Sequence, residues 1–157
     1  MPLASVQYGF RQSFRVPANA AFAWCTDFGP GDGQLFSERT LRSIRQLSET
    51  ALVMTDTTYP EGRPLRIRRL VRIFPSEMAW TNTHLDGPYR HSQYWYRVVS
   101  DGPTKSHLEF RGLRLESPPR ALSGTETTRR AQQLRREDSG EWRRRLAPAL
   151  ERDVRET

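Results

Sequence analysis

The sequence predicts an α+β fold in which a curved antiparallel sheet of seven strands surrounds a long C-terminal helix. Two observations carry this prediction. Strand-like segments separated by turn residues fill the chain from residue 40 to residue 115. The last stretch, residues 138–156, has its apolar residues on one side of a helix. An apolar sheet face and an apolar helix stripe can bury each other when the sheet curves around the helix.

The first strand is predicted by alternation. Apolar and polar residues alternate over residues 6–16, with Gln12 as the polar exception on the inner face. A proline then precedes Ala18–Cys25, an alanine-rich segment that predicts a short helix. The glycine-rich residues 28–35 predict an irregular connection, and we expect a second short helix near Gln34.

Six further segments have the composition and spacing of strands. They are separated by turn signals at intervals of about 8–12 residues, which is typical of an antiparallel meander. The segments are residues 40–47, 51–59, 65–74, 78–85, 90–99 and 106–115.

The final segment predicts the long helix, with Ser139 as its N-cap. Its apolar stripe consists of Trp142, Leu146, Ala149, Leu150 and Val154. Pro148 interrupts the helical hydrogen bonds but projects from the polar side. Residues 125–136 are helix-forming and weakly amphipathic. If they are continuous with the final helix, Gly140 is the expected joint.

Composition excludes several classes of site. Cys25 is the only cysteine, which rules out an internal disulfide framework and a cysteine-based metal site. The three histidines have no spacing suited to zinc, and no phosphate loop, dinucleotide fingerprint or Ser-His-Asp arrangement is present. We therefore expect no metal and no organic cofactor.

The net charge of +7 raises the question of nucleic-acid binding. Lys105 is the only lysine, and the arginines are dispersed along the chain. This pattern favours a solvated surface over a phosphate-binding one, so no specific nucleic-acid partner is expected. The N-terminus lacks a basic region followed by an apolar run, and no apolar stretch is long enough to span a bilayer. We expect a cytoplasmic protein with one domain over residues 1–157.

The order of elements resembles the START/Bet v1-like (SRPBCC) superfamily, which has the helix-grip fold and includes polyketide cyclases and lipid-transfer domains. The matching stretches are FRQSFRVP, ANAAFAWC, YRVVSDGPTKSHLEF and EWRRRLAPALERDV. The sequence departs from the plant allergens of this group, because Ser48, Glu49 and Thr50 stand where those proteins have a glycine-rich loop. The resemblance implies a cavity between sheet and helix that holds a hydrophobic or amphipathic small molecule.

Arg69 is the first candidate site residue. In the strand Leu65–Phe74 the more apolar face consists of Leu65, Ile67, Arg69, Val71 and Ile73, so Arg69 should point inward. A buried guanidinium is unfavourable unless it is paired, which makes it a functional candidate. The alternative is a β-bulge at Arg68–Arg69 that exposes both side chains.

The remaining candidates share inner strand faces. Trp80, Asn82 and His84 alternate on one strand, where a few polar groups among hydrophobic ones are typical of a pocket lining. The alternative, which we prefer for His84, places Asn82 and His84 at the open end of the sheet in contact with water. Tyr94, Tyr96 and Phe110 are expected on the same interior, as ligand contacts or as core.

The leading hypothesis is binding or transport of a small molecule by a monomer or homodimer. The ligand-binding residues would be Gln12, Arg69, Trp80, Asn82, His84, Tyr94, Tyr96 and Phe110. The pocket is expected to open near residues 29–33, with Arg69 as the anchor for an anionic or carbonyl group. One alternative is a cyclase, dehydratase or hydrolase that uses these polar residues for acid–base chemistry. Another is a module whose basic helical tail binds an acidic protein.

Overall fold

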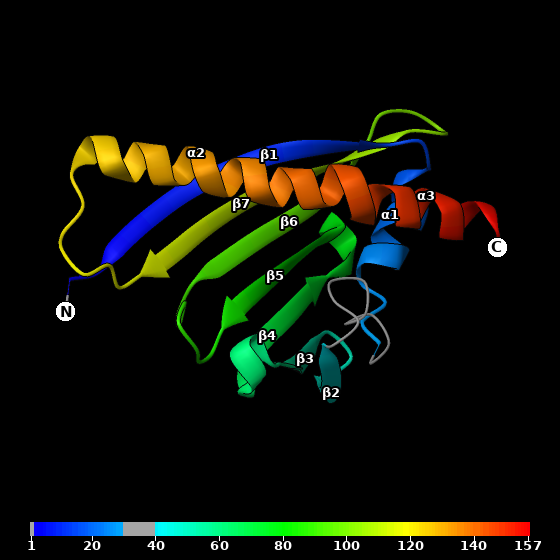
Figure 1. The fold of residues 1–157 in the computed structure, drawn as a ribbon. Coiled ribbons are helices and arrows are strands. Elements are labelled where there is room, and N and C mark those ends of the chain that lie inside the picture. Colours follow the sequence, from blue (N-terminus) through cyan, green and yellow to red (C-terminus); the bar gives the residue numbers. More distant parts are fainter. Residues whose placement is uncertain (1, 30–39) are drawn as a thin grey trace.

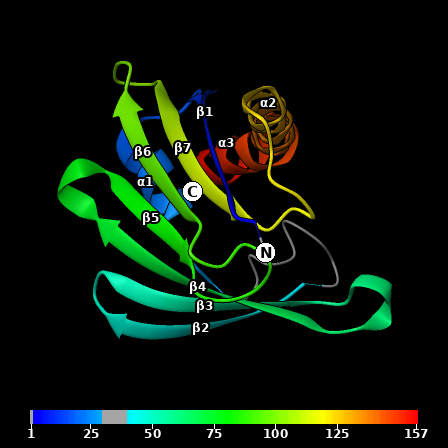
Figure 2. The ribbon, with the colours of Figure 1, turned by 90° about the vertical axis from the view of Figure 1, so that its left-hand side faces the viewer.

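The structure, a computed structural model, describes residues 2–29 and 40–157. In these ranges seven strands form one antiparallel sheet in the order β1-β7-β6-β5-β4-β3-β2. The sheet curves, and a long helix crosses its concave side (Figures 1 and 2). This confirms the predicted arrangement. The strands are β1 (Ala4–Phe14), β2 (Leu41–Ser48), β3 (Ala51–Thr58), β4 (Leu65–Phe74), β5 (Ala79–His84), β6 (Gln93–Ser100) and β7 (Ser106–Glu116).

The register of β4 places Arg69 on the inner face. The pairing of β4 with β3 runs without a shift from Leu65 to Arg72, and its pairing with β5 is also regular. The alternative of a bulge at Arg68–Arg69 is therefore wrong. A bulge is not needed to relieve the buried charge, because Asp56 on β3 lies close enough to pair with Arg69.

A short helix follows β1, as predicted. This helix, α1, spans Ala18–Cys25, and the hydroxyl of Thr26 donates to the carbonyl of Phe22 at its C-terminal end. The second short helix expected near Gln34 lies outside the described residues. Two 3-10 turns flank β4 on its two sides, η2 (Pro60–Gly62) and η3 (Pro75–Glu77).

The long C-terminal helix begins earlier than predicted. It consists of α2 (Gly124–Glu141), a π-helical segment η4 (Trp142–Leu146) and α3 (Ala147–Arg155), without a break. The N-cap is Ser123 and not Ser139, because Ser123 and Glu126 form a capping box. The Ser123 hydroxyl accepts from the Glu126 backbone N–H, and the Glu126 carboxylate accepts from that of Ser123.

Gly140 does not form a joint between two helices. It is buried within α2, and the guanidinium of Arg144, one turn later, packs over it. A Cβ atom at position 140 would lie 2.8 Å from Nη2 of Arg144. The glycine therefore provides room for a side chain on the next turn, and the helix continues through it.

The π-helical segment η4 lies directly before Pro148. Its signature is the bond from the N–H of Ala147 to the carbonyl of Trp142, five residues earlier. Proline has no N–H and its ring clashes with the preceding turn of an α-helix, so a wider turn at this point accommodates it. Pro148 is exposed, as the sequence pattern predicted.

The core lies between the sheet and the helix in two clusters. One lies beneath α1 and α3 and includes Phe14, Leu108 and Leu150. The other lies beneath α2 and includes Val6, Phe110 and Leu134. The predicted stripe is confirmed, because Leu146, Ala149 and Leu150 are buried, and Trp142 and Val154 pack against the core. Within residues 2–29 and 40–157, no helix has the length and hydrophobicity that crossing a bilayer requires.

Candidate functional site

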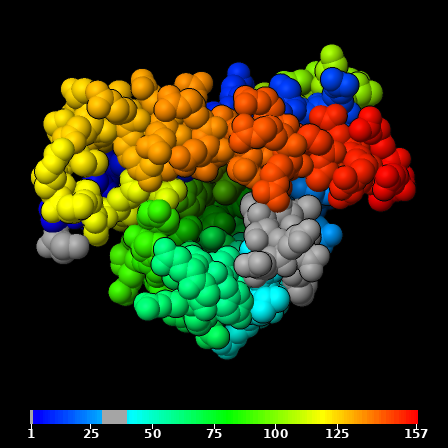
Figure 3. Space-filling view, viewed as in Figure 1, coloured from blue at the N-terminus to red at the C-terminus, as the bar shows by residue number. Residues whose placement is uncertain are grey.

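Two hollows lie between the sheet and the long helix, with volumes of about 640 Å³ and 420 Å³. Figure 3 shows the surface hollowed between the helix and the green strands below it. The hollows adjoin, since six residues line both of them. These are Arg42, Met54, Asn82, Tyr96, Trp142 and Leu146. Trp80 and Tyr96 both line the larger hollow.

The larger hollow, here called the aromatic hollow, lies beside α1 and α3. Its wall contains the stacked rings of Trp80 and Tyr96, which pair across β5 and β6 with centroids 4.8 Å apart and planes within 2°. The indole N–H of Trp24 on α1 donates to the Asp153 carboxylate on α3 at 2.9 Å. This bond joins the two helices at the edge of the hollow.

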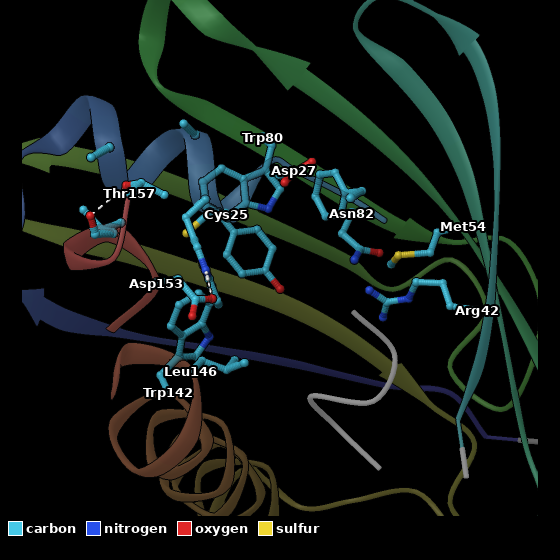
Figure 4. Close-up of a pocket in the computed structure, with 16 residues that line it drawn as sticks. Cys25, Asp27, Arg42, Met54, Trp80, Asn82, Trp142, Leu146, Asp153 and Thr157 are labelled. Carbon is cyan, nitrogen blue, oxygen red and sulfur yellow. Dashed lines mark hydrogen bonds between the residues drawn. The ribbon is translucent and has the colours of Figure 1, made fainter. Parts of the chain in front are cut away.

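The side chains of the aromatic hollow converge from three directions (Figure 4). Trp80 and Asn82 extend from β5, Arg42 and Met54 from β2 and β3, and Trp142 and Leu146 from the helix. The opening predicted near residues 29–33 falls mostly outside the described residues. Asp27 and Phe28, just before it, line this hollow.

The smaller hollow, here called the polar hollow, contains an ion-pair network centred on Asp56. The Arg42 guanidinium donates to both carboxylate oxygens, with Nε–Oδ1 and Nη2–Oδ2 distances of 2.7 and 2.9 Å. Nη1 of Arg69 donates to Oδ2 at 2.6 Å. Burial alone would raise the pKa of Asp56, but the two guanidiniums outweigh it and hold the pKa below its usual value. Asp56 is therefore ionised and shared by two cations.

His84 is a neutral member of this network. Our preferred expectation, that it meets water at the open end, is wrong, because His84 is only 6% exposed. Burial, followed by the charges of Arg69 and Arg114, lowers its pKa to about 4. Nε2 lies 3.4 Å from Nε of Arg69, which can only donate, so the single proton of the neutral ring is assigned to Nδ1.

Three buried polar atoms in the polar hollow have no hydrogen-bond partner within the described residues. They are Oδ1 of Asn82, Nδ1 of His84 and Nε of Arg114. Buried polar atoms are almost always satisfied in folded proteins. Their grouping around one hollow indicates that this space receives water or a ligand.

Tyr8 and Asp138 form a part-buried pair on the helix side of the polar hollow. The phenol of Tyr8 on β1 donates to Oδ2 of Asp138 on α2. Burial raises the pKa of Asp138, against the lowering effects of the Tyr8 bond and of Arg114. Burial likewise raises the pKa of Tyr8. Burial therefore shifts both groups of the pair towards their protonated forms.

The Tyr8–Asp138 contact depends on the absence of a side chain at Gly112. A Cβ atom there would lie 2.8 Å from Cε1 of Tyr8. We expect Gly112→Ala to displace the Tyr8 ring and lower the free energy of unfolding by about 1–3 kcal/mol in urea titrations. Gly124→Ala is the control, because a Cβ at that position meets nothing within 4 Å. Equal stability of the two variants would contradict this account.

The structure brings together most of the predicted ligand-binding residues. Asn82 and Tyr96 line both hollows, and Trp80 lines the aromatic one. The polar hollow contains Arg69, His84, Tyr94 and Phe110. Gln12 lies apart from both, and its amide donates to the carbonyl of Ser13.

Sequence reasoning missed several charged residues of the site, and for three of them a usable signal was present. Arg42, Asp56 and Arg114 each continue an alternating inner strand face, as Arg69 does. Asp138 gave no such signal, because the helix that carries it was predicted to start there. Within the described residues, no group of three or more His, Cys, Asp or Glu side chains could hold a metal ion.

Neither protein-family models nor curated proteins match the sequence. Solved structures do match the fold. The Zhui aromatase/cyclase from a Streptomyces species has 12% identity and a TM-score of 0.67, covering 98% of this chain and 94% of its own. Norcoclaurine synthase from Thalictrum flavum has 11% identity and a TM-score of 0.68, covering 98% of this chain and 88% of its own. A START superfamily protein from Mycobacterium smegmatis has 14% identity and a TM-score of 0.64, covering 96% of this chain and 97% of its own.

These likenesses extend over nearly the whole chain at identities of 11–14%. At this level of identity they establish the fold alone. The protein therefore has the helix-grip fold that the order of its elements predicted, and it shares this fold with the three solved structures.

Proposed function

We propose that the protein binds an amphipathic small molecule in the space between the sheet and the C-terminal helix. The observation that carries this proposal is the pair of adjoining hollows with unpartnered polar atoms in the smaller one. A purely structural core would fill this volume with aliphatic side chains and leave no polar atom unsatisfied. The aromatic hollow suits the apolar part of the ligand, and the polar hollow suits its polar end.

Native mass spectrometry of the purified protein tests the proposal directly. We expect a small molecule to remain bound under gentle ionisation and to be lost on denaturation. Binding of N-phenyl-1-naphthylamine, a neutral dye that fluoresces in apolar sites, provides a second measure. We expect saturable binding of this dye to the ligand-free protein.

A substitution within the cavity tests where the dye binds. Leu146 lines both hollows, so Leu146→Phe should reduce their volume and lower the dye affinity at least tenfold. The control is Leu47→Phe on β2, since Leu47 is exposed. Circular dichroism would check that both variants are folded. No saturable binding to the wild-type protein, or an unchanged affinity in Leu146→Phe, would contradict the proposal.

The Tyr8–Asp138 pair favours a second candidate, an enzyme that uses Asp138 for proton transfer. The solved relatives with the same fold include an aromatase/cyclase and norcoclaurine synthase. The two candidates differ in what happens to the co-purified molecule. A binding protein should return it unchanged after incubation. An enzyme should convert its substrate to a new mass, and Asp138→Asn should slow that conversion.

A further inference from the structure

Among the described residues three arginines line the polar hollow, and two of them share one carboxylate. Arg42 and Arg69 share the carboxylate of Asp56 through three hydrogen bonds of 2.6–2.9 Å. Removing either guanidinium from that carboxylate to bind a ligand would break a buried ion pair, which is strongly unfavourable. Arg69 is therefore better explained as a structural residue than as the anchor that its inward position first suggested.

Arg114 differs from the other two arginines. It extends from the inner face of β7 into the polar hollow, and its Nε has no hydrogen-bond partner within the described residues. The nearest carboxylate oxygen among the described residues is Oε2 of Glu116, 3.7 Å from Nε. Glu116 is itself held by Arg130 on α2 through two bonds of 2.8 Å. The Glu116 carboxylate is thus paired mainly with Arg130. It compensates the positive charge of Arg114 only in part.

The Arg114 guanidinium is also held in position without a ligand. Its central carbon lies 3.5 Å from the centre of the Tyr89 ring, and its side chain is mostly buried. A cation stacked on an aromatic ring loses little further conformational freedom when it binds a partner. The hydrogen-bonding edge of Arg114 is thus preorganised.

The other described carboxyl groups that line the polar hollow form no direct ion pair with Arg114, although its charge opposes the burial that raises the pKa of Asp138. Asp138 accepts from Tyr8, and Glu141 lies 3.3 Å from Arg145. Across the described ranges, neither carboxyl group forms an ion pair with Arg114 within 4.0 Å. An imidazole is either neutral or positively charged, so His84 cannot serve as a counter-ion. Of the described arginines that line the hollow, Arg114 is therefore the one whose guanidinium has no hydrogen bond to a carboxylate.

We propose that Arg114 anchors a single acidic group, a carboxylate, at the polar end of an amphipathic ligand. The planar guanidinium can donate two parallel hydrogen bonds to such a group, and the apolar part would then extend towards the stacked Trp80 and Tyr96 rings. This inference rests on the proposed function, because it specifies the chemistry of the molecule that the cavity holds.

Two fluorescent probes of nearly the same shape test the inference. One is 8-anilinonaphthalene-1-sulfonate, whose sulfonate stands in for the carboxylate, and the other is the neutral N-phenyl-1-naphthylamine. We expect Arg114→Gln to weaken binding of the sulfonate probe at least tenfold and to change the affinity of the neutral probe less than twofold. Arg114→Lys, which keeps the charge but loses the planar fork, should show an intermediate loss.

Two other arginines serve as controls for net charge and for position. Arg111 is exposed on the outer face of the same strand, so Arg111→Gln should leave both affinities unchanged. Arg69→Gln should lower stability but not the preference for the sulfonate probe.

Several outcomes would overturn the inference. They are equal losses for both probes in Arg114→Gln, no loss for the sulfonate probe, or a comparable selective loss in Arg111→Gln or Arg69→Gln. Failure of the neutral probe to bind the wild-type protein would instead contradict the proposed function itself.

Discussion

Truncating Leu150 should destabilise the protein by about 2–5 kcal/mol, the range found when a buried leucine is replaced by alanine. Leu150 is 0% exposed and belongs to the core cluster beneath α1 and α3. The substitution removes its contacts with that cluster and leaves a cavity in the core. Urea unfolding of Leu150→Ala should show a lower midpoint with an unchanged slope.

Leu41→Ala is the matched control for this prediction. It makes the same chemical change on β2, where Leu41 is 61% exposed. Its effect should stay within about 0.5 kcal/mol. If both variants unfolded at the same urea concentration, packing of the C-terminal helix against the sheet would not be a main source of stability.

Replacing Asp56 with asparagine should lower the free energy of unfolding by about 3–5 kcal/mol at neutral pH, because it leaves two guanidiniums without their shared counter-ion. The side chains of Asp56 and Arg42 are buried, and that of Arg69 is mostly buried. Water can therefore replace the lost carboxylate only in part. Chemical denaturation at pH 7 would measure the loss.

The same network predicts a pH dependence with a definite sign. The folded-state pKa of Asp56 lies below its ordinary value of 3.8. Its stabilising contribution is therefore complete above about pH 4 and is lost as the pH falls through the lowered folded-state pKa. Asp56→Asn should be less stable than the wild type at pH 7, and this difference should shrink in acid.

Asp86→Asn provides the comparison for an exposed pair. Asp86 pairs with Arg68 at 2.7 Å, but the two side chains are 34% and 53% exposed. Such pairs contribute about 0–1 kcal/mol. A loss in Asp86→Asn as large as in Asp56→Asn would show that burial does not determine the strength of these pairs.

The fold could be predicted because two simple periodicities specify it. The alternation of apolar and polar residues placed the strands within a few residues of their observed ends. The apolar stripe on one side of the last segment identified the helix that the sheet surrounds. The start of the helix was misplaced, since Ser139 and Gly140 looked like a cap and a joint. The capping box of Ser123 and Glu126 was a stronger signal, but it precedes a segment with little amphipathicity.

The site was predictable only where strand alternation reaches it. The inward position of Arg69 followed from its apolar neighbours, but its partner did not, because the Asp56–Arg69 contact depends on the register between two strands. The Tyr8–Asp138 contact joins residues 130 positions apart. No local pattern encodes such a contact, and it becomes visible only once β1 lies beneath α2.

The π-helical segment before Pro148 also determines which residues of the long helix face the sheet. Leu134 and Leu150 are both 0% exposed, yet they are sixteen residues apart. In an uninterrupted α-helix, at about 100° per residue, they would point about 160° away from each other. A π turn accommodates one extra residue, which reduces this separation to about 60°. The helix thus carries one apolar stripe before the π turn and another after it. The widened turn rotates the second stripe towards the direction of the first, so that both pack on the same curved sheet.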